Sequence, residues 1–262
     1  MQGKPQVTTD APPAADRYSR QSRFWAIGAE GQARLAAGRV VIVGCGGLGS
    51  AVIAQLARAG VGHLVVIDRD GVELGNLHRQ VLYDEADAAA GTFKAVAAAA
   101  AVGRINAGVE VVAVVAEVTA DNIESLVADA DVVIDGTDNL ETRYVINDAC
   151  LKAGIPWVYG GAVGSTGMVM TILPGETACL RCLLPTPPAK GTVETAATAG
   201  VLVSSVVMVA ALQWTEAVKL LLGDREHVNR GLVAFDVWTN DHVQSAGVPR
   251  RPDCPGCGQW RT

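Results

Sequence analysis

The segment between Val40 and Ser50 constrains the fold of this chain more than any other. It begins with four apolar residues, which predict a buried strand, and it continues with a run of glycines at Gly44, Gly46, Gly47 and Gly49. Glycines permit a tight turn and a close backbone approach, so the helix that follows can hold a phosphate at its N-terminus. A second apolar run ends at Asp68, 24 positions after Gly44, where a carboxylate can accept hydrogen bonds from ribose hydroxyls. These two features predict a nucleotide site, and alone they would indicate a dinucleotide dehydrogenase.

Strand and helix patterns alternate through the first half of the chain. Apolar runs predict strands at about residues 39–43, 64–67, 109–115 and 131–134. Helices are predicted at about residues 50–59, 92–106, 121–128 and 140–152, after one or two short helices within residues 17–34. This alternation predicts an α/β fold, with a doubly wound, Rossmann-like and mostly parallel sheet joined by right-handed crossovers.

The pattern changes after Pro156. Apolar runs interrupted by glycines predict strands at residues 158–163, 168–173 and 232–237, so we expect the second half to continue the sheet in mixed or antiparallel form. A loop without periodicity covers residues 184–198. A helix is predicted from Val201 to Leu222, ending at Gly223. The apolar stretch 196–214 approaches membrane-spanning length, but its glycine and serines favour a buried helix.

The length of 262 residues suits a single domain over residues 17–262, with a nucleotide-binding half at about 17–153 and a second half at about 154–262. Residues 1–16 are polar and rich in Pro and Ala. They lack the basic region and apolar core of a signal peptide, so we expect a flexible tail on a cytoplasmic protein. The net charge of −6 argues against nucleic acid or an anionic membrane as the main partner.

Two Cys-x-x-Cys pairs lie in the second half, Cys179 with Cys182 and Cys254 with Cys257. Each spacing lets two thiolates bind one metal, and two such pairs complete a tetrahedral zinc site with no open position. The alternatives are disulfides, which the lack of a secretory signal disfavours, and a redox motif, which needs only one pair. We therefore predict a structural Zn²⁺ site. Cys45 and Cys150 are left over, and neither has the surroundings of a nucleophile.

A cluster of polar residues follows the second predicted strand, at Asn76, Arg79 and Gln80. Hydride transfer gains little from an arginine beside the phosphates. Attack at an α-phosphate builds charge on the pyrophosphate leaving group, which fixed cations and a metal stabilise. Arg79 and Lys94 can supply the cations, and Asp138, after the fourth strand, can hold Mg²⁺. Taken singly, Arg79 and Lys94 would be solvated surface charges, and Asp138 would be a helix N-cap; together they favour chemistry at the α-phosphate.

At this point the chain resembles the MoeB/ThiF/HesA adenylyltransferases, the bacterial relatives of ubiquitin-activating enzymes. The resemblance covers about residues 17–260. It rests on Arg17-Tyr-Ser-Arg20-Gln21, Gly44-Cys-Gly-Gly-Leu-Gly49, Asp68, Asn76-Leu-His-Arg79-Gln80, Lys94, Asp135-Gly-Thr-Asp138-Asn139 and the two cysteine pairs. It implies a homodimer with a zinc site remote from the chemistry. It also implies that ATP adenylates the C-terminal glycine of a small ubiquitin-like or sulfur-carrier protein ending in Gly-Gly, with release of pyrophosphate.

The resemblance implies a role for each matching residue. Asp68 would bind ribose, and the turn at Gly44, Gly46, Gly47 and Gly49 would approach the nucleotide. The residues holding the phosphates would be Asn76, Arg79 and Lys94, with Gln80 close by. Asp138 would ligate Mg²⁺, and Arg20 would reach the site of the partner subunit. Residues 160–167, in the carrier-binding and zinc half, would line the groove for the flexible tail of the carrier.

One position departs from the family. Where many relatives carry a loop Cys two residues before Ala-Gly-Val, this chain has Ala196. A methyl group cannot attack an acyl-adenylate, so we expect no thioester or acyl-disulfide step through this loop. Either the reaction stops at the adenylate, or Ala196 is an engineered replacement of a natural cysteine. We expect no sulfurtransferase domain after Thr262, so any sulfur donor is expected to be a separate protein.

Three alternatives remain open from the sequence. A family member can act on another carboxylate, such as a peptide C-terminus or a modified tRNA base. The glycine turn and Asp68 alone would also suit an NAD-dependent oxidoreductase. The third alternative is an inactive protein that binds a ubiquitin-like partner, which the joint retention of Arg20, Arg79, Lys94 and Asp138 disfavours.

Overall fold

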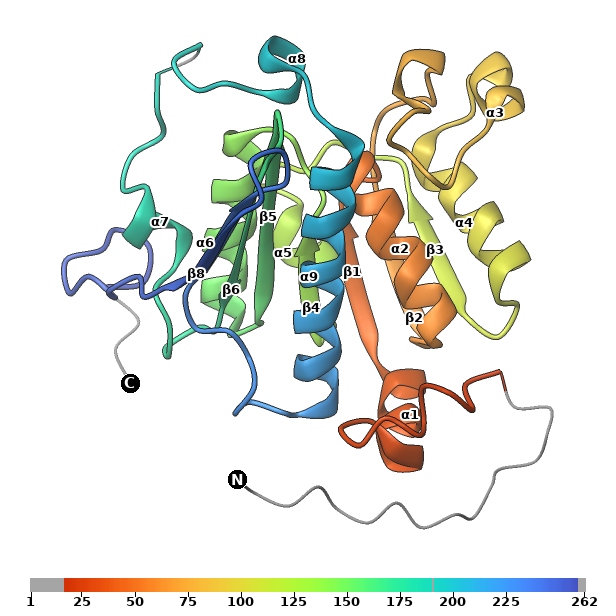
Figure 1. Ribbon diagram of the computed structural model, residues 1–262, viewed down its shortest axis with the longest axis horizontal. Coiled ribbons are helices and arrows are strands. Elements are labelled where there is room, and N and C mark those ends of the chain that lie inside the picture. The colour runs from red at the N-terminus through yellow and green to blue at the C-terminus, as the bar shows by residue number, and fades with distance from the viewer. Residues whose placement is uncertain (1–16, 190, 259–262) are drawn as a thin grey trace.

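The computed structural model describes residues 17–189 and 191–258, and these form one eight-stranded sheet with helices on both faces (Figure 1). The strand order is β3-β2-β1-β4-β5-β6-β7-β8. The strands are β1 (Arg39–Val43), β2 (His63–Ile67), β3 (Glu110–Val114), β4 (Val132–Asp135), β5 (Trp157–Val163), β6 (Thr166–Ile172), β7 (Leu232–Asp236) and β8 (Asp241–Ala246). Strands β1 to β5 are parallel, whereas β6, β7 and β8 each pair antiparallel with their neighbours. This confirms the predicted Rossmann-like sheet with an antiparallel continuation.

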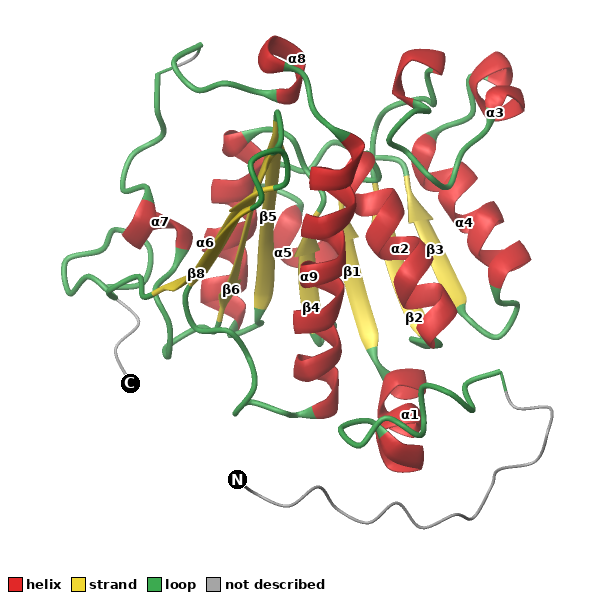
Figure 2. Ribbon diagram, viewed as in Figure 1, coloured by secondary structure: helices red, strands yellow, loops and turns green. Residues whose placement is uncertain are grey.

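The helices divide between the two faces of the sheet (Figure 2). In chain order the helical segments are α1 (Gly28–Ala37), α2 (Gly47–Ala59), η1 (Leu74–Asn76), α3 (Glu85–Ala90), α4 (Lys94–Ile105), α5 (Ile123–Val127), α6 (Leu140–Ala153), α7 (Leu180–Leu183), α8 (Ala196–Ala199) and α9 (Val203–Leu222). Side chains from α2, α4 and α9 share one hydrophobic core, and those from α5, α6 and α7 share the other. The alanines of α4 suit this arrangement, because small buried side chains let the helix lie close to α2 and the sheet.

Helix α9 is long and apolar enough to cross a membrane by length and composition, but half of its most apolar window is buried inside the protein. Val206, Val209 and Ala210 pack in the same core as α2. The helix ends at Gly223 in the left-handed conformation, as the sequence predicts. It therefore belongs to the core, where it covers β5 and β6.

Several boundaries differ from the prediction. The first nucleotide helix begins at Gly47 rather than near residue 50, because the glycines of the turn already belong to its first turn. The segment before Lys94 contains a separate short helix, α3, which a capping box at Asp84 begins and the left-handed Gly91 ends. Strand β8 was not predicted. The expected flexible tail, residues 1–16, lies outside the described residues.

Candidate functional site

The glycine turn lies between β1 and α2, at the point where the strand order reverses between β1 and β4. Gly44 has a φ of +91°, and a Cβ on it would lie 2.7 Å from the carbonyl oxygen of Gly136, just after β4. A Cβ on Gly49 would lie 1.9 Å from the carbonyl oxygen of Gly44. Side chains are therefore excluded at both positions. The first N–H groups of α2 have no partner within the helix, so they can receive an anion.

Asp68 closes one side of this turn. Its carboxylate accepts hydrogen bonds from the backbone N–H of Cys45 (2.7 Å) and of Asp70 (2.8 Å). Burial raises the pKa of the Asp68 carboxyl, and these two N–H groups oppose that rise by stabilising the charged form. Each carboxylate oxygen keeps a free lone pair. Asp68 is thus fixed at the end of β2 and can still accept bonds from ribose hydroxyls.

The cations predicted to bind phosphates lie near the same turn. Arg79 flanks it, since its Cγ would lie 3.5 Å from a Cβ on Gly47. Lys94 begins α4 and is buried, and its Nζ lies 3.1 Å from a carboxylate oxygen of Asp70. Because burying an ammonium group is costly unless it is paired, this ion pair offsets the cost of placing Lys94 beside the nucleotide edge of the sheet.

Two amides complete this edge. Gln80 is buried, its Nε2 would lie 3.9 Å from a Cβ on Gly46, and its Oε1 has no hydrogen-bond partner among the described residues. A buried acceptor without a partner is costly, so it is a candidate for contact with a ligand. Asn76 donates instead to Glu73, at 3.0 Å. The structure therefore places Arg79 and Gln80 beside the turn, and the role of Asn76 stays a prediction.

Asp138 is exposed and follows β4. It is not the N-cap of α6, because Asn139 takes that role and accepts a bond from the N–H of Thr142 at 2.8 Å. Within the described residues, no hydrogen bond or ion pair engages the Asp138 carboxylate. An exposed, unpaired carboxylate two residues from Gly136, and therefore next to the glycine turn, fits a ligand for Mg²⁺.

A buried ion pair, which the sequence analysis did not predict, supports the loop that carries Asp138. Asp135 is fully buried and pairs with Arg143 of α6, with 2.9 Å between Oδ2 and Nε. Gln213 of α9, also fully buried, donates to the backbone oxygen of Asp135 at 2.7 Å. The only sequence signals were a carboxylate ending an apolar strand and a glutamine within an apolar helix.

Arg20 lies far from the turn of its own chain. The neighbouring Gln21 donates to the backbone oxygen of Ala59, at the C-terminal end of α2, while the glycine turn lies at the other end. Thirteen residues of α-helix span roughly 20 Å. Arg20 is exposed, and no described residue pairs with it.

At two positions of the β5–β6 hairpin, close packing rather than a groove explains why the residue is glycine. A Cβ on Gly160 would lie 2.4 Å from Nε2 of Gln213, and a Cβ on Gly167 would lie 2.3 Å from the ring of Phe235. Both glycines therefore allow close packing on the α9 side of the sheet. Gly161 faces the other side, toward the hydroxyl of Tyr159. Of these three glycines, it alone remains a candidate for lining the groove.

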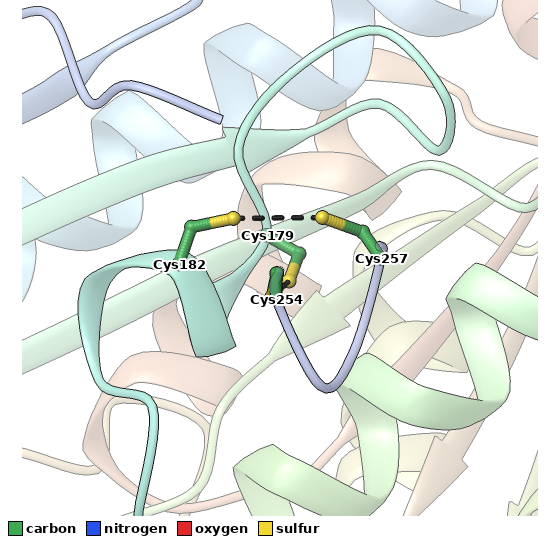
Figure 3. A group of neighbouring side chains, drawn as sticks. All are labelled: Cys179, Cys182, Cys254 and Cys257. Atoms are coloured by element: carbon green, nitrogen blue, oxygen red, sulfur yellow. Dashed lines mark hydrogen bonds between the residues drawn. The ribbon is translucent and has the colours of Figure 1, made fainter. Parts of the chain in front are cut away.

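The four paired cysteines meet in one cluster (Figure 3). They belong to the hydrophobic core on the face of the sheet opposite α2. All four are buried and none is in a disulfide. Their sulfur atoms lie within 4.8 Å of one another, and the pairs Cys179–Cys254 and Cys182–Cys257 are each 3.5 Å apart. A tetrahedral zinc with bonds of about 2.3 Å separates its sulfurs by about 3.8 Å. The cluster therefore fits zinc.

The remaining cysteines do not resemble nucleophiles. Cys45 and Cys150 are fully buried, and burial raises the pKa of both thiols above the usual range. A thiol that stays protonated and covered cannot attack an acyl group. This agrees with the interpretation from the sequence.

Comparison with known proteins places this geometry in a family. A family model described as the ThiF family matches residues 18–256. The sulfur carrier protein ThiS adenylyltransferase of Bacillus subtilis is 45% identical over 243 residues, which are 92% of this chain and 71% of that protein. The SAMP-activating enzyme E1 of Haloferax volcanii is 45% identical over 246 residues, 93% of this chain and 89% of that protein. A crystal structure of E. coli MccB with ATP superposes with a TM-score of 0.79 at 24% identity, covering 94% of this chain and 75% of that one. At this identity, the MccB match bears on the fold alone.

Proposed function

Because this chain belongs to the ThiF family of adenylyltransferases, we propose that it uses ATP to activate the C-terminal glycine of a small sulfur-carrier or ubiquitin-like protein ending in Gly-Gly. The observation that carries the proposal is the gathering of the glycine turn, Asp68, Arg79 and Lys94 at one edge of the sheet, with Asp138 beside them. Of two relatives at 45% identity, one is named as the adenylyltransferase of a sulfur carrier protein and the other as a SAMP-activating enzyme. Their names favour a carrier over a peptide or a tRNA as the substrate.

The reaction needs orientation more than acid–base chemistry. The carboxylate of the carrier is already ionised, attacks the α-phosphorus of ATP in line, and displaces pyrophosphate. Asp68 would hold the ribose while the first N–H groups of α2 receive phosphate oxygens. Arg79 and Lys94 would offset the charge that develops on the leaving group. Asp138 would hold Mg²⁺, which supplies further neutralisation of the phosphates when bound.

Carrier-dependent exchange of labelled pyrophosphate into ATP tests this function. We expect exchange only when a carrier with a free Gly-Gly terminus is present, and none when the terminus is blocked as an amide. NAD⁺ binding without ATP binding would favour the oxidoreductase alternative. Exchange with a free peptide but with no carrier would favour a peptide substrate.

We also propose that the reaction on this chain ends at the acyl-adenylate. Ala196 is the first residue of α8, where its N-cap is Thr195, and neither side chain can form a thioester. The chain has six cysteines, of which four form the buried cluster and two are buried singly. A thiolate or persulfide on a separate protein would then attack the acyl carbon. A carbon–sulfur bond would form, the carbon–oxygen bond to phosphate would break, and AMP would leave.

The position of Arg20 supports a homodimer with shared sites. Arg20 lies at one end of α2 and the glycine turn at the other, so two copies packed with their α2 helices antiparallel would bring Arg20 of each to the turn of the other. A groove of about 630 Å³ runs along α2, α4 and α9, and Val81 and Val207 in it are 55% and 44% exposed. Apolar side chains left in water on this face suit contact with a second copy.

A mixed dimer tests that arrangement. Arg20→Ala and Asp138→Ala should each strongly reduce exchange on their own. Mixing the two variants under conditions that allow subunits to redistribute should recover about a quarter of the parent activity, because half of the dimers contain one intact site out of two. Absence of recovery, with subunit exchange verified by mass spectrometry, would contradict a site shared between subunits.

For the cysteine cluster we propose a structural Zn²⁺ held by Cys179, Cys182, Cys254 and Cys257. The set offers four sulfur ligands and no open position, so the metal would have no part in the chemistry. Chelation, or Cys257→Ser, should remove one equivalent of zinc and lower the unfolding midpoint by roughly 10 °C. ATP affinity should stay within twofold of the parent, because the cluster packs with α6 and α7, whereas the glycine turn lies between β1 and α2. Protein that holds no zinc when purified in its presence would overturn the assignment.

A further inference from the structure

At their carboxyl ends, β4 and β5 are joined by side chains rather than by a ladder of backbone hydrogen bonds. The backbone register between the two strands covers Val133 with Trp157 and Ile134 with Val158, and it stops there. Beyond that point Arg143 takes over, because its Nη2 donates to the backbone oxygens of Thr137 (2.7 Å) and Gly160 (2.8 Å). One guanidinium nitrogen therefore connects the loop after β4 with strand β5.

The charge of Arg143 is fully compensated. Its Nε lies 2.9 Å from Oδ2 of Asp135, and its guanidinium carbon lies 5.0 Å from the centre of the Tyr159 ring. The other carboxylate oxygen of Asp135 accepts bonds from the backbone N–H and the hydroxyl of Thr137, at 2.9 and 2.6 Å. A buried ion pair adds little stability over apolar residues, but the hydrogen bonds of this pair hold the Thr137 loop and β5 in one arrangement.

We propose that Arg143 is a positioning residue that holds the Asp138 loop in register with the β5 segment where the carrier tail enters. The proposal rests on the proposed function. Thr137 immediately precedes Asp138, and Gly160 immediately precedes Gly161, which faces the opposite side from α9. Holding both backbone oxygens sets the loop with the metal ligand against the segment that lines the tail. In-line attack depends on that alignment, and a displacement of about 1 Å can cost about 100-fold in rate.

The planar fork of arginine is essential to this arrangement. Lysine keeps the positive charge beside Asp135, so the buried carboxylate stays paired and the protein stays folded. A single ammonium group cannot pair with Asp135 through one nitrogen while another bridges the two backbone oxygens. Arg143→Lys therefore keeps the positive charge beside Asp135 but removes the bridge between the two backbone oxygens.

The chain contains a matched control. Arg181 pairs with Asp148 through two bonds, Nε to Oδ1 at 2.8 Å and Nη2 to Oδ2 at 2.6 Å, and its guanidinium carbon lies 4.6 Å from the centre of the Tyr144 ring. It is also an arginine with an aspartate and a tyrosine, but it touches neither the Asp138 loop nor β5. Arg181→Lys removes the same fork at a distance from the site.

In carrier-dependent pyrophosphate exchange, we expect Arg143→Lys to lower kcat about 100-fold. ATP affinity without Mg²⁺ should remain within twofold of the parent, because the ribose and phosphate contacts lie on the other side of β4. Arg181→Lys should keep the parent kcat. A parent-like kcat for Arg143→Lys would overturn the proposal, and so would a loss of Mg²⁺-free ATP affinity as large as the loss of kcat, which would indicate general unfolding.

A second readout does not need the carrier. If Arg143 fixes Asp138, Arg143→Lys should lose most of the gain in ATP affinity that Mg²⁺ gives the parent protein, as measured by calorimetry with and without Mg²⁺. An unchanged gain would contradict the positioning role. The two conclusions fail differently: absence of exchange by the parent protein contradicts the proposed function, whereas the Mg²⁺-dependent gain still decides the role of Arg143.

Discussion

Replacing Asp138 by Ala should lower carrier-dependent pyrophosphate exchange by about 1,000-fold or more while the protein stays folded. Asp138 is exposed and forms no hydrogen bond or ion pair with a described residue, so its loss removes only a minor electrostatic attraction to Arg143. The cap of α6 also survives, because Asn139 supplies it. The variant would lose only the oxygen ligand proposed for Mg²⁺. The measurement is exchange at saturating ATP, with unfolding by urea as the check on stability.

Asp129→Ala is the matched control for this variant. Asp129 is also exposed, and it carries the same charge, but it precedes β4 and so lies at the opposite end of that strand. It should keep the parent exchange rate. Retained exchange by Asp138→Ala would show that this carboxylate has no part in the reaction, and an equal loss in both variants would point to net charge instead.

Gly49→Ala should disrupt the nucleotide turn. The added methyl carbon would lie 1.9 Å from the carbonyl oxygen of Gly44, and both atoms belong to backbone that β1 and α2 hold in place. Since no side-chain rotation can relieve this overlap, α2 must move away from β1. We expect a loss of about 3 kcal/mol in the free energy of unfolding and no measurable ATP binding. Urea unfolding and calorimetric titration with ATP measure the two effects.

Gly103→Ala is the control for this substitution. Gly103 lies inside α4, and a Cβ there would meet nothing within 4 Å. Alanine should therefore raise the free energy of unfolding by about 0.5–1 kcal/mol, because it restricts the unfolded chain and suits a helix. If both variants were equally stable and bound ATP equally well, the close approach at Gly49 would not be a constraint on the fold.

The first half of the fold was predictable because its signals are local. The parallel strands β1, β2 and β4 are buried on both faces and read as apolar runs, and glycines interrupt the chain where the backbone must turn. The parallel edge strand β3 is largely exposed, but its valines still predict a strand. Strand β8 was missed because it is an edge strand, which needs no such run; its sequence from Asp241 to Ala246 contains Asp, His, Gln and Ser.

The candidate site was predictable only in part. Asp68 and Asp138 follow strands, Lys94 begins a helix, and Arg79 lies in the loop after β2, so a sequence can place them at one edge of a sheet. Arg143 and Gln213 could not be placed, because their roles depend on elements far apart in the chain meeting at β4. Arg20 stays a prediction for a related reason: its proposed target belongs to another molecule.

The cysteine cluster has a consequence for the chain as a polymer. A metal bridging Cys182 and Cys254 would close a loop over residues 183–253, which contains α8, α9, β7 and the edge strand β8. Such a closure removes conformational entropy from the unfolded chain, which raises its free energy by about 4 kcal/mol at room temperature. Helix α9 lies inside this loop and supplies Gln213, which donates to the backbone oxygen of Asp135 at the end of β4. The metal would therefore also restrict the unfolded conformations of the segment that makes this contact.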